Sequence, residues 1–129
     1  MEYSGAMSTR KPAAAEIAAL LPLPHADFHI LVTLAGDELH GYAILQDVAD
    51  RTAGTVRIET GTLYRSIHRL LEKGLVVESS ERPDPALDDE RRRYYRITPL
   101  GTAVARAEAA RLAALVDLAR AKGLAPQGV

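Results

Sequence analysis

The 129-residue sequence contains no cysteine and no tryptophan, and only 5% of its residues are aromatic. Without cysteine, the chain can form neither disulfides nor thiolate sites. Because aromatic side chains are so few, aliphatic side chains and alanine must fill the core. The sequence also lacks an apolar run long enough to span a bilayer and a recognisable signal peptide. These absences predict a cytoplasmic protein that does not enter membranes.

The charge is almost balanced, with 16 lysine and arginine residues against 17 aspartate and glutamate residues and a net charge of -1. Many nucleic-acid-binding proteins are strongly basic, so this average counts mildly against DNA binding. An average can hide a local patch, and the positions of the charges therefore matter more than their sum. The length fits one domain with a modest core.

The spacing of apolar residues predicts a mainly α-helical chain with one small β-hairpin. The predicted helices span about 12–21, 26–35, 40–54 and 60–73, the strands 75–79 and 93–98, and a long last helix begins at Thr98 and Pro99. In the third helix the expected apolar stripe consists of Tyr42, Leu45, Val48 and Ala49. His40 is expected to cap this helix or to pack against the HGY turn.

Three central helices followed by a two-stranded hairpin are the order of a winged helix-turn-helix. This order predicts a winged helix-turn-helix domain over 12–98, which includes an N-terminal helix. A dimerisation helix is predicted over 99–123. Residues 1–11 and 124–129 are predicted to be disordered tails.

The segment TGTLYRSIHRLLEKGLV, residues 60–76, has a helical pattern with two different faces. At about 100° per residue, one side gathers Leu63, Ile67, Leu70 and Leu71, and the other gathers Gly61, Thr62, Arg65, Arg69 and Glu72. Small residues followed by arginines suit a helix that approaches DNA bases and phosphates. An ordinary solvated helix shows the same contrast, so the segment alone leaves both interpretations open.

The predicted hairpin adds a second basic cluster. Its returning arm carries Arg91, Arg92, Arg93 and Arg96 beside Tyr94 and Tyr95. Arginines on a wing can hold phosphates and fix the register of a protein on DNA. The alternative is that Arg91, Arg92 and Arg93 pair with Asp88, Asp89 and Glu90 just before them, which would contribute little.

The last helix carries apolar residues near a seven-residue rhythm. The positions expected to form a dimer contact are Leu100, Val104, Ala107, Leu112, Leu115 and Leu118. Alanines between them allow two helices to approach closely. The alternative is that the helix packs on its own domain, but a helix of this length would overhang so small a domain.

Three stretches, HGYAI at 40–44, GTLYRSIHRLLEKGLV at 61–76 and RRRYYRITPLG at 91–101, resemble the PadR family of transcriptional regulators. The resemblance implies a homodimeric winged helix-turn-helix that binds double-stranded operator DNA, usually as a repressor, with a short tail of one C-terminal helix. Its DNA contacts would come from Thr62, Tyr64, Arg65 and Arg69 on the recognition helix and from Arg91, Arg92 and Arg93 on the wing. Glu59, just before this helix, departs from the family pattern and would repel a phosphate.

The family resemblance also implies release from DNA by a small molecule or another signal. A pocket between the last helix and the helix at 26–35 would then be lined by Phe28, Leu31, Leu112 and Leu115. The competing prediction is a winged helix that binds protein and not DNA, which the acidic wing loop, Glu59 and the net charge favour.

Other kinds of site have little support in the sequence. His25 and His29 can share one helical face, but no glutamate follows the first of them as a zinc protease requires. Two histidines alone also leave a metal site short of ligands. No phosphate-binding loop or catalytic triad is recognisable, so the sequence predicts no enzyme, no cofactor and no metal.

Overall fold

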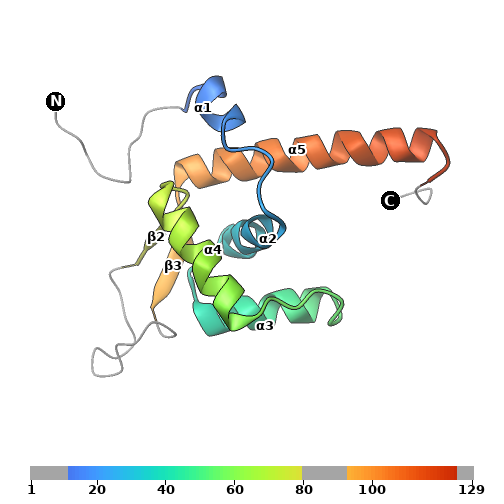
Figure 1. Ribbon diagram of the computed structural model, residues 1–129. Helices are drawn as coiled ribbons and strands as arrows, with labels where there is room; N and C mark the ends of the chain where they lie inside the picture. Colours follow the sequence, from blue (N-terminus) through green and yellow to red (C-terminus); the bar gives the residue numbers. More distant parts are fainter. Residues whose placement is uncertain (1–11, 80–92, 125–129) are drawn as a thin grey trace.

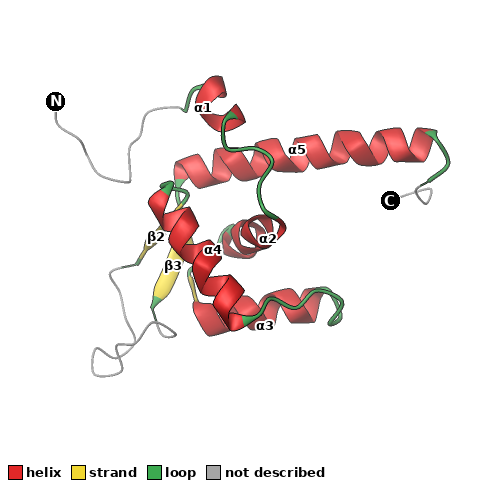
Figure 2. Cartoon of the chain, viewed as in Figure 1, coloured by secondary structure: helices red, strands yellow, loops and turns green. Residues whose placement is uncertain are grey.

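The computed structural model describes residues 12–79 and 93–124, and helices dominate it (Figures 1 and 2). In chain order the elements are α1 (Ala14–Ala18), α2 (His25–Leu34), β1 (Leu39–His40), α3 (Gly41–Arg51), α4 (Thr60–Glu72), β2 (Val76–Glu78), β3 (Tyr94–Ile97) and α5 (Pro99–Ala121). The predicted winged-helix order is confirmed, with β1 as an additional strand. The predicted tails lie outside the described residues, except for Leu124.

The core lies around α2, which Figure 1 shows between α4, α3 and the long α5. Its buried apolar side chains are Leu23, Ile30, Leu31, Leu34, Ile44, Val48, Leu63, Ile67, Leu70, Leu75, Val76, Tyr95 and Val104. Tyr95 is the one aromatic residue in this set, so the core is aliphatic, as the composition predicted. Burying one such leucine or isoleucine stabilises the fold by roughly 1.5–3 kcal/mol.

The sheet has three antiparallel strands in the order β1–β3–β2. Leu39 of β1 lies opposite Tyr95, and His40 lies opposite Tyr94. The imidazole of His40 also meets the ring of Tyr94 edge-on, with 5.3 Å between ring centroids. A two-residue strand is too short for the alternation that predicts strands, which explains why the sequence indicated only a two-stranded hairpin.

His40 begins α3 as its N-cap, and the predicted cap is confirmed. Its Nδ1 accepts a hydrogen bond of 3.1 Å from the backbone N–H of Ala43. The predicted apolar stripe of this helix is wrong at Tyr42, whose exposed fraction is 63%. Val48 of the predicted stripe is fully buried, and so is Ile44, which the prediction left out, because the core-facing side of α3 passes through the residue before Tyr42.

That residue is Gly41, where the side chain of Tyr64 from α4 packs directly against the backbone of α3. A Cβ at Gly41 would overlap the hydroxyl of Tyr64 and stand 3.0 Å from its Cζ. Gly41 itself is buried, and Tyr64 is half-buried against the core. The glycine of HGY and the tyrosine of GTLY are therefore two halves of one contact between helices.

Polar side chains tie α3 to α2. Arg51 donates from Nε to Asp47 Oδ2 at 2.9 Å and from Nη2 to Thr33 Oγ1 at 2.6 Å and the His29 carbonyl at 3.2 Å. Thr33 in turn donates to Asp47 Oδ2 at 3.0 Å. The hydrogen bond from Arg51 lowers the pKa of the Asp47 carboxyl. α3 is thus held to α2 both by apolar packing and by this network.

The start of α5 is fixed by its N-cap, Thr98. The Thr98 hydroxyl accepts from the Gly101 N–H at 3.0 Å and donates to the Gly74 carbonyl at 2.6 Å, which joins α5 to the turn after α4. Proline occupies the first helical position, where no N–H is needed. At Gly101 a Cβ would overlap the Leu75 carbonyl oxygen, so the first turn of α5 packs directly against the backbone of the turn between α4 and β2.

Further along α5, Glu108 links the helix to the segment before α2. Only 2% of this residue is exposed. Its carboxylate accepts hydrogen bonds from Nε and Nη2 of Arg111 at 2.7 and 2.8 Å. It also accepts a hydrogen bond from the backbone of Leu23, and its pKa is lowered mainly by Arg111. Beyond this point α5 projects past the other helices (Figure 1). None of the described helices, α5 included, is long and apolar enough to cross a membrane.

Replacing Gly41 with alanine tests the contact between α3 and α4. We expect Gly41→Ala to lower the free energy of unfolding by about 1–3 kcal/mol, because the added methyl group overpacks against Tyr64. Adding Tyr64→Phe removes the hydroxyl and should recover part of that loss. Urea unfolding followed by circular dichroism measures both effects.

The matched control is Gly61→Ala, at an exposed helical glycine whose Cβ would come no closer than 3.4 Å to Arg65 Nη1. This change should leave stability unaltered or raise it by up to about 1 kcal/mol. Equal urea midpoints for Gly41→Ala and the unaltered chain would contradict the close contact.

Candidate nucleic-acid interface

Helix α4 buries one face and leaves the other in solvent, as its pattern predicted. Its fully buried side chains are Leu63, Ser66, Ile67 and Leu70. The exposed positions are Thr60, Gly61, Arg65, His68 and Glu72. Small residues therefore stand at the start of the exposed face and a basic residue follows them one turn later. This surface could enter the major groove of DNA, which is wide enough to admit a helix.

Arg65 has an exposed side chain near the start of this face. Its Nη2 donates to the Thr62 hydroxyl at 3.1 Å. Among the described residues no carboxylate forms an ion pair with it. A guanidinium in this position can present its remaining donors to an acceptor outside the chain, such as a guanine edge or a phosphate.

Arg69 lies one turn further along and has a different environment. Its Nε and Nη2 donate to the two carboxylate oxygens of Asp27 at 3.0 and 2.7 Å, and Nη2 also donates to Ser66 Oγ at 3.2 Å. The side chain of Asp27 is 1% exposed and that of Arg69 is 37% exposed. The hydrogen bonds to Asp27 raise the pKa of the Arg69 guanidinium. Both in-plane donors that face Asp27 are thus engaged inside the chain.

Thr62 and Tyr64, the other two residues of α4 that were predicted to contact DNA, also differ from each other in their surroundings. Thr62 is half-buried and lies on the exposed side of α4 beside Arg65. Tyr64 is directed at Gly41 of α3. The four predicted contacts are therefore not equivalent, because Thr62 and Arg65 lie at the surface while Tyr64 and Arg69 hold α4 to its neighbours.

Glu59 is the N-cap of α4, and its side chain makes no capping hydrogen bond. The backbone carbonyl of Glu59 accepts from the Leu63 N–H at 2.8 Å, so the helix begins regularly. The first turn contains no acidic residue, and the positive end of the helix dipole faces outward beside the small residues. N–H groups at such an end favour a phosphate, whereas the exposed Glu59 carboxylate opposes one.

On the wing, only part of the prediction falls on described residues. Arg93 lies 3.7 Å from Glu78, measured from Nε to Oε2 across β3 and β2. Its side chain is 41% exposed. Arg91 and Arg92, with the acidic residues before them, lie outside the described residues.

The sequence reasoning missed two residues near the start of α4. Tyr42 is exposed and follows Gly41, which contacts Tyr64, so it lies close to the first turns of α4. Arg57 is also exposed, two residues before Glu59. Tyr42 is exposed because Gly41 before it faces the core and turns the next side chain away, a direction that the sequence does not mark.

Some of the predicted dimer residues pack on their own domain, and others are exposed and available for a dimer contact. Val104 belongs to the core, and Leu100, Ala107 and Leu112 are half-buried. Leu115 and Leu118 are 56% and 53% exposed, and Val116 between them is 40% exposed. The first half of α5 thus packs on its own domain, and the second half carries an apolar surface that nothing described in this chain covers.

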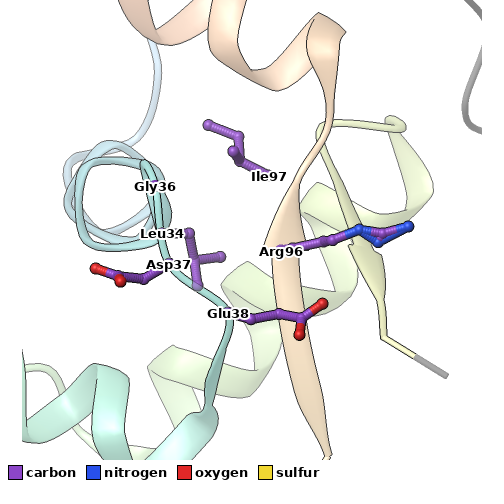
Figure 3. A pocket seen from close by; sticks show the side chains of 6 residues that line it. All are labelled: Leu34, Gly36, Asp37, Glu38, Arg96 and Ile97. Carbon is purple, nitrogen blue, oxygen red and sulfur yellow. The ribbon is translucent and has the colours of Figure 1, made fainter. Parts of the chain in front are cut away.

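The predicted effector-pocket residues do not share one environment. Leu31 is fully buried in the core, Phe28 and Leu112 are half-buried, and Leu115 is exposed. A shallow cavity of about 290 Å³ lies elsewhere, between the turn after α2 and strand β3, and is lined by Leu34, Gly36, Asp37, Glu38, Arg96 and Ile97. Figure 3 shows the Arg96 guanidinium on the other side of the strand from Asp37.

The two histidines at the start of α2 face each other, as their spacing predicted. The ring centroids of His25 and His29 are 4.5 Å apart and the rings meet edge-on. Burial, followed by the nearby His25 and Arg51, lowers the pKa of His29. Within residues 12–79 and 93–124, no group of three or more His, Asp or Glu side chains is placed to hold a metal ion.

Comparison with known proteins supports the interpretation of the motifs. The family model for the transcriptional regulator PadR-like family matches residues 30–107. An uncharacterized protein of Lysinibacillus sphaericus is 38% identical over 79 residues, which cover 61% of this chain and 70% of that protein. The transcriptional regulator Rv3488 of Mycobacterium tuberculosis is 41% identical over 75 residues, or 58% of this chain and 64% of that protein, so less than two thirds of this regulator is matched.

Solved structures share the fold. A transcriptional regulator from Clostridium thermocellum superposes with a TM-score of 0.64 at 23% identity, over 84% of this chain and 95% of that one. A PadR family transcription regulator from Clostridium difficile superposes with a TM-score of 0.63 at 21% identity, over 75% of this chain and 96% of that one. A family of transcription regulators, and not of enzymes, accounts for the winged-helix fold and for the HGY and GTLY motifs. The chain belongs to the PadR-like family of transcriptional regulators.

Proposed function

We propose that this protein is a sequence-specific DNA-binding regulator that places α4 in the major groove of double-stranded operator DNA. The observation that carries the proposal is the exposed face of α4, where Arg65 follows the small residues Gly61 and Thr62 and has no carboxylate partner among the described residues. A helix face of this kind allows close approach to the base edges and then supplies a cation. Membership of a family of transcriptional regulators also supports DNA binding.

Arg65 is the residue that reads sequence in this proposal. Its guanidinium can donate two parallel hydrogen bonds to O6 and N7 of a guanine. Thr62 orients that side chain through the hydrogen bond between its hydroxyl and Arg65. Tyr42 and Arg57, exposed beside the start of α4, and the arginines of the wing would bind phosphates and set the register.

We also propose that the DNA-binding form is a homodimer joined through the second half of α5. The exposed Leu115, Val116 and Leu118 form an apolar surface on a helix that projects from the domain, which is the arrangement of a two-fold helix pairing. A dimer presents two α4 helices to successive major grooves, about 10 bp apart. Repression, and release by a small molecule or another signal, are the regulatory behaviour that the family resemblance favours.

The Arg65→Ala variant tests the reading role. We expect affinity for DNA from just upstream of the protein's own gene to fall by about 1–3 kcal/mol, roughly tenfold to a hundredfold, and the preference over scrambled DNA to shrink. Fluorescence anisotropy over a salt series measures both. Arg106→Ala is the matched control, because Arg106 is an exposed arginine on α5 and its removal changes the net charge equally.

Equal losses for the two variants would mean that α4 holds no specific contact. Absence of any salt-dependent binding to either DNA would instead favour a winged helix that binds protein, for which the exposed Glu59 carboxylate at the start of α4 is the supporting observation.

The double variant Leu115→Glu with Leu118→Glu tests the dimer. Charges in the middle of an apolar helix pairing should convert the dimer to a monomer, because isolated carboxylates are costly to bury. Light scattering coupled to size-exclusion chromatography measures the mass. Ala113→Glu is the control, since it adds charge to an exposed position that lies about 160° around α5 from Leu115. A dimer that persists in the double variant would place the interface elsewhere.

A further inference from the structure

We propose that Arg69 is a positioning residue, which fixes α4 on α2 through Asp27 and makes no contact with DNA. The inference rests on the proposed function and assigns a different role to a residue that the sequence grouped with Arg65. It also gives a role to Asp27, a buried carboxylate that no motif marked.

The geometry of the pair supports this role. Two parallel hydrogen bonds of 3.0 and 2.7 Å join the Arg69 guanidinium to the Asp27 carboxylate. Such a two-point pair fixes both the distance and the relative orientation of the groups. Because the Asp27 side chain is only 1% exposed, it cannot follow Arg69 toward the solvent, and the pair therefore holds α4 to α2.

The comparison with Arg65 separates the two arginines. Arg65 stands four residues earlier on α4 and is exposed, and among the residues that the structure describes its side chain bonds only to Thr62, within the same helix. Arg69 also receives the support of Ser66, a fully buried residue whose hydroxyl accepts from Nη2 at 3.2 Å. For Arg69 to bind a phosphate through the same two donors, the buried Asp27 would have to lose its partner, which is strongly unfavourable.

Two contacts would then set the orientation of α4. Tyr64, in its first half, packs against Gly41 of α3, and Arg69, in its last turn, is paired with Asp27 of α2. One contact in each half of the helix, together with the apolar packing of Leu63, Ile67 and Leu70, opposes both sliding and tilting of α4. A reading side chain tolerates little misplacement, since displacements on the order of 1 Å weaken precisely aligned contacts strongly.

The Asp27→Asn variant distinguishes the two roles by the sign of its effect. If Arg69 bound DNA, removing the carboxylate would free the arginine, remove a negative charge and strengthen binding. If Arg69 positions α4, the same change should weaken binding roughly tenfold while the slope of log affinity against log salt stays the same. The probe is a fluorescein-labelled duplex from just upstream of the protein's own gene, measured by anisotropy over a salt series.

Two further variants separate positioning from a general loss of fold. Glu72→Gln is the matched control for Asp27→Asn, because it also removes one negative charge, here from an exposed position of α4. It should bind DNA as tightly as the unaltered chain or more tightly. Arg69→Lys keeps the charge but loses the two-point pair, and it should weaken binding with an unchanged salt slope. Circular dichroism establishes that each variant is folded at the measuring temperature.

Tighter binding by Asp27→Asn would overturn the positioning role, and so would a salt slope about one unit smaller in Arg69→Gln, which is the loss of one phosphate contact. Both results leave the proposed function intact. No salt-dependent binding by the unaltered chain would overturn the proposed function, and the positioning role with it.

Discussion

The packing of every other long helix against α2 is the constraint on which this structure depends. Apolar side chains of α2 and the segment before it form the centre of the core, and three polar links add orientation. Asp27 pairs with Arg69 of α4, Thr33 joins the network of Arg51 on α3, and the Leu23 backbone bonds to Glu108 of α5. The helix proposed to read DNA, α4, and the helix proposed to dimerise, α5, are thus both attached to α2. In a dimer, α2 would therefore set the spacing between the two α4 helices.

The family motifs acquire a physical meaning from these contacts. In HGY, the histidine caps α3, the glycine allows α4 to approach, and the tyrosine faces solvent. In GTLY, the tyrosine fills the space over Gly41. Gly41 and Tyr64, one from each motif, therefore place α4 against α3, and Leu63 anchors it in the core. A recognisable DNA-binding motif is in this case partly a packing motif.

The sequence was sufficient for the helix order, the core stripe of α4 and the family, because these depend on periodicity and on short motifs. It could not distinguish Arg65 from Arg69, since the two stand one turn apart on the same face and the difference is made by Asp27, which lies 42 residues before Arg69. The exposure of Tyr42 was hidden for a similar reason, because an aromatic residue at helical spacing suits a core stripe equally well. Strand β1 has only two residues, and its pairing with β3 is decided by tertiary contacts.

The central claim is that the exposed face of α4 lies in the major groove, and protection of guanine N7 from dimethyl sulfate tests it most directly. N7 is a major-groove atom, so its reactivity reports on that groove alone. On the duplex upstream of the protein's own gene, the account predicts two protected clusters about one helical turn, roughly 10 bp, apart. Bound DNA in which every guanine N7 remains as reactive as in free DNA would contradict it.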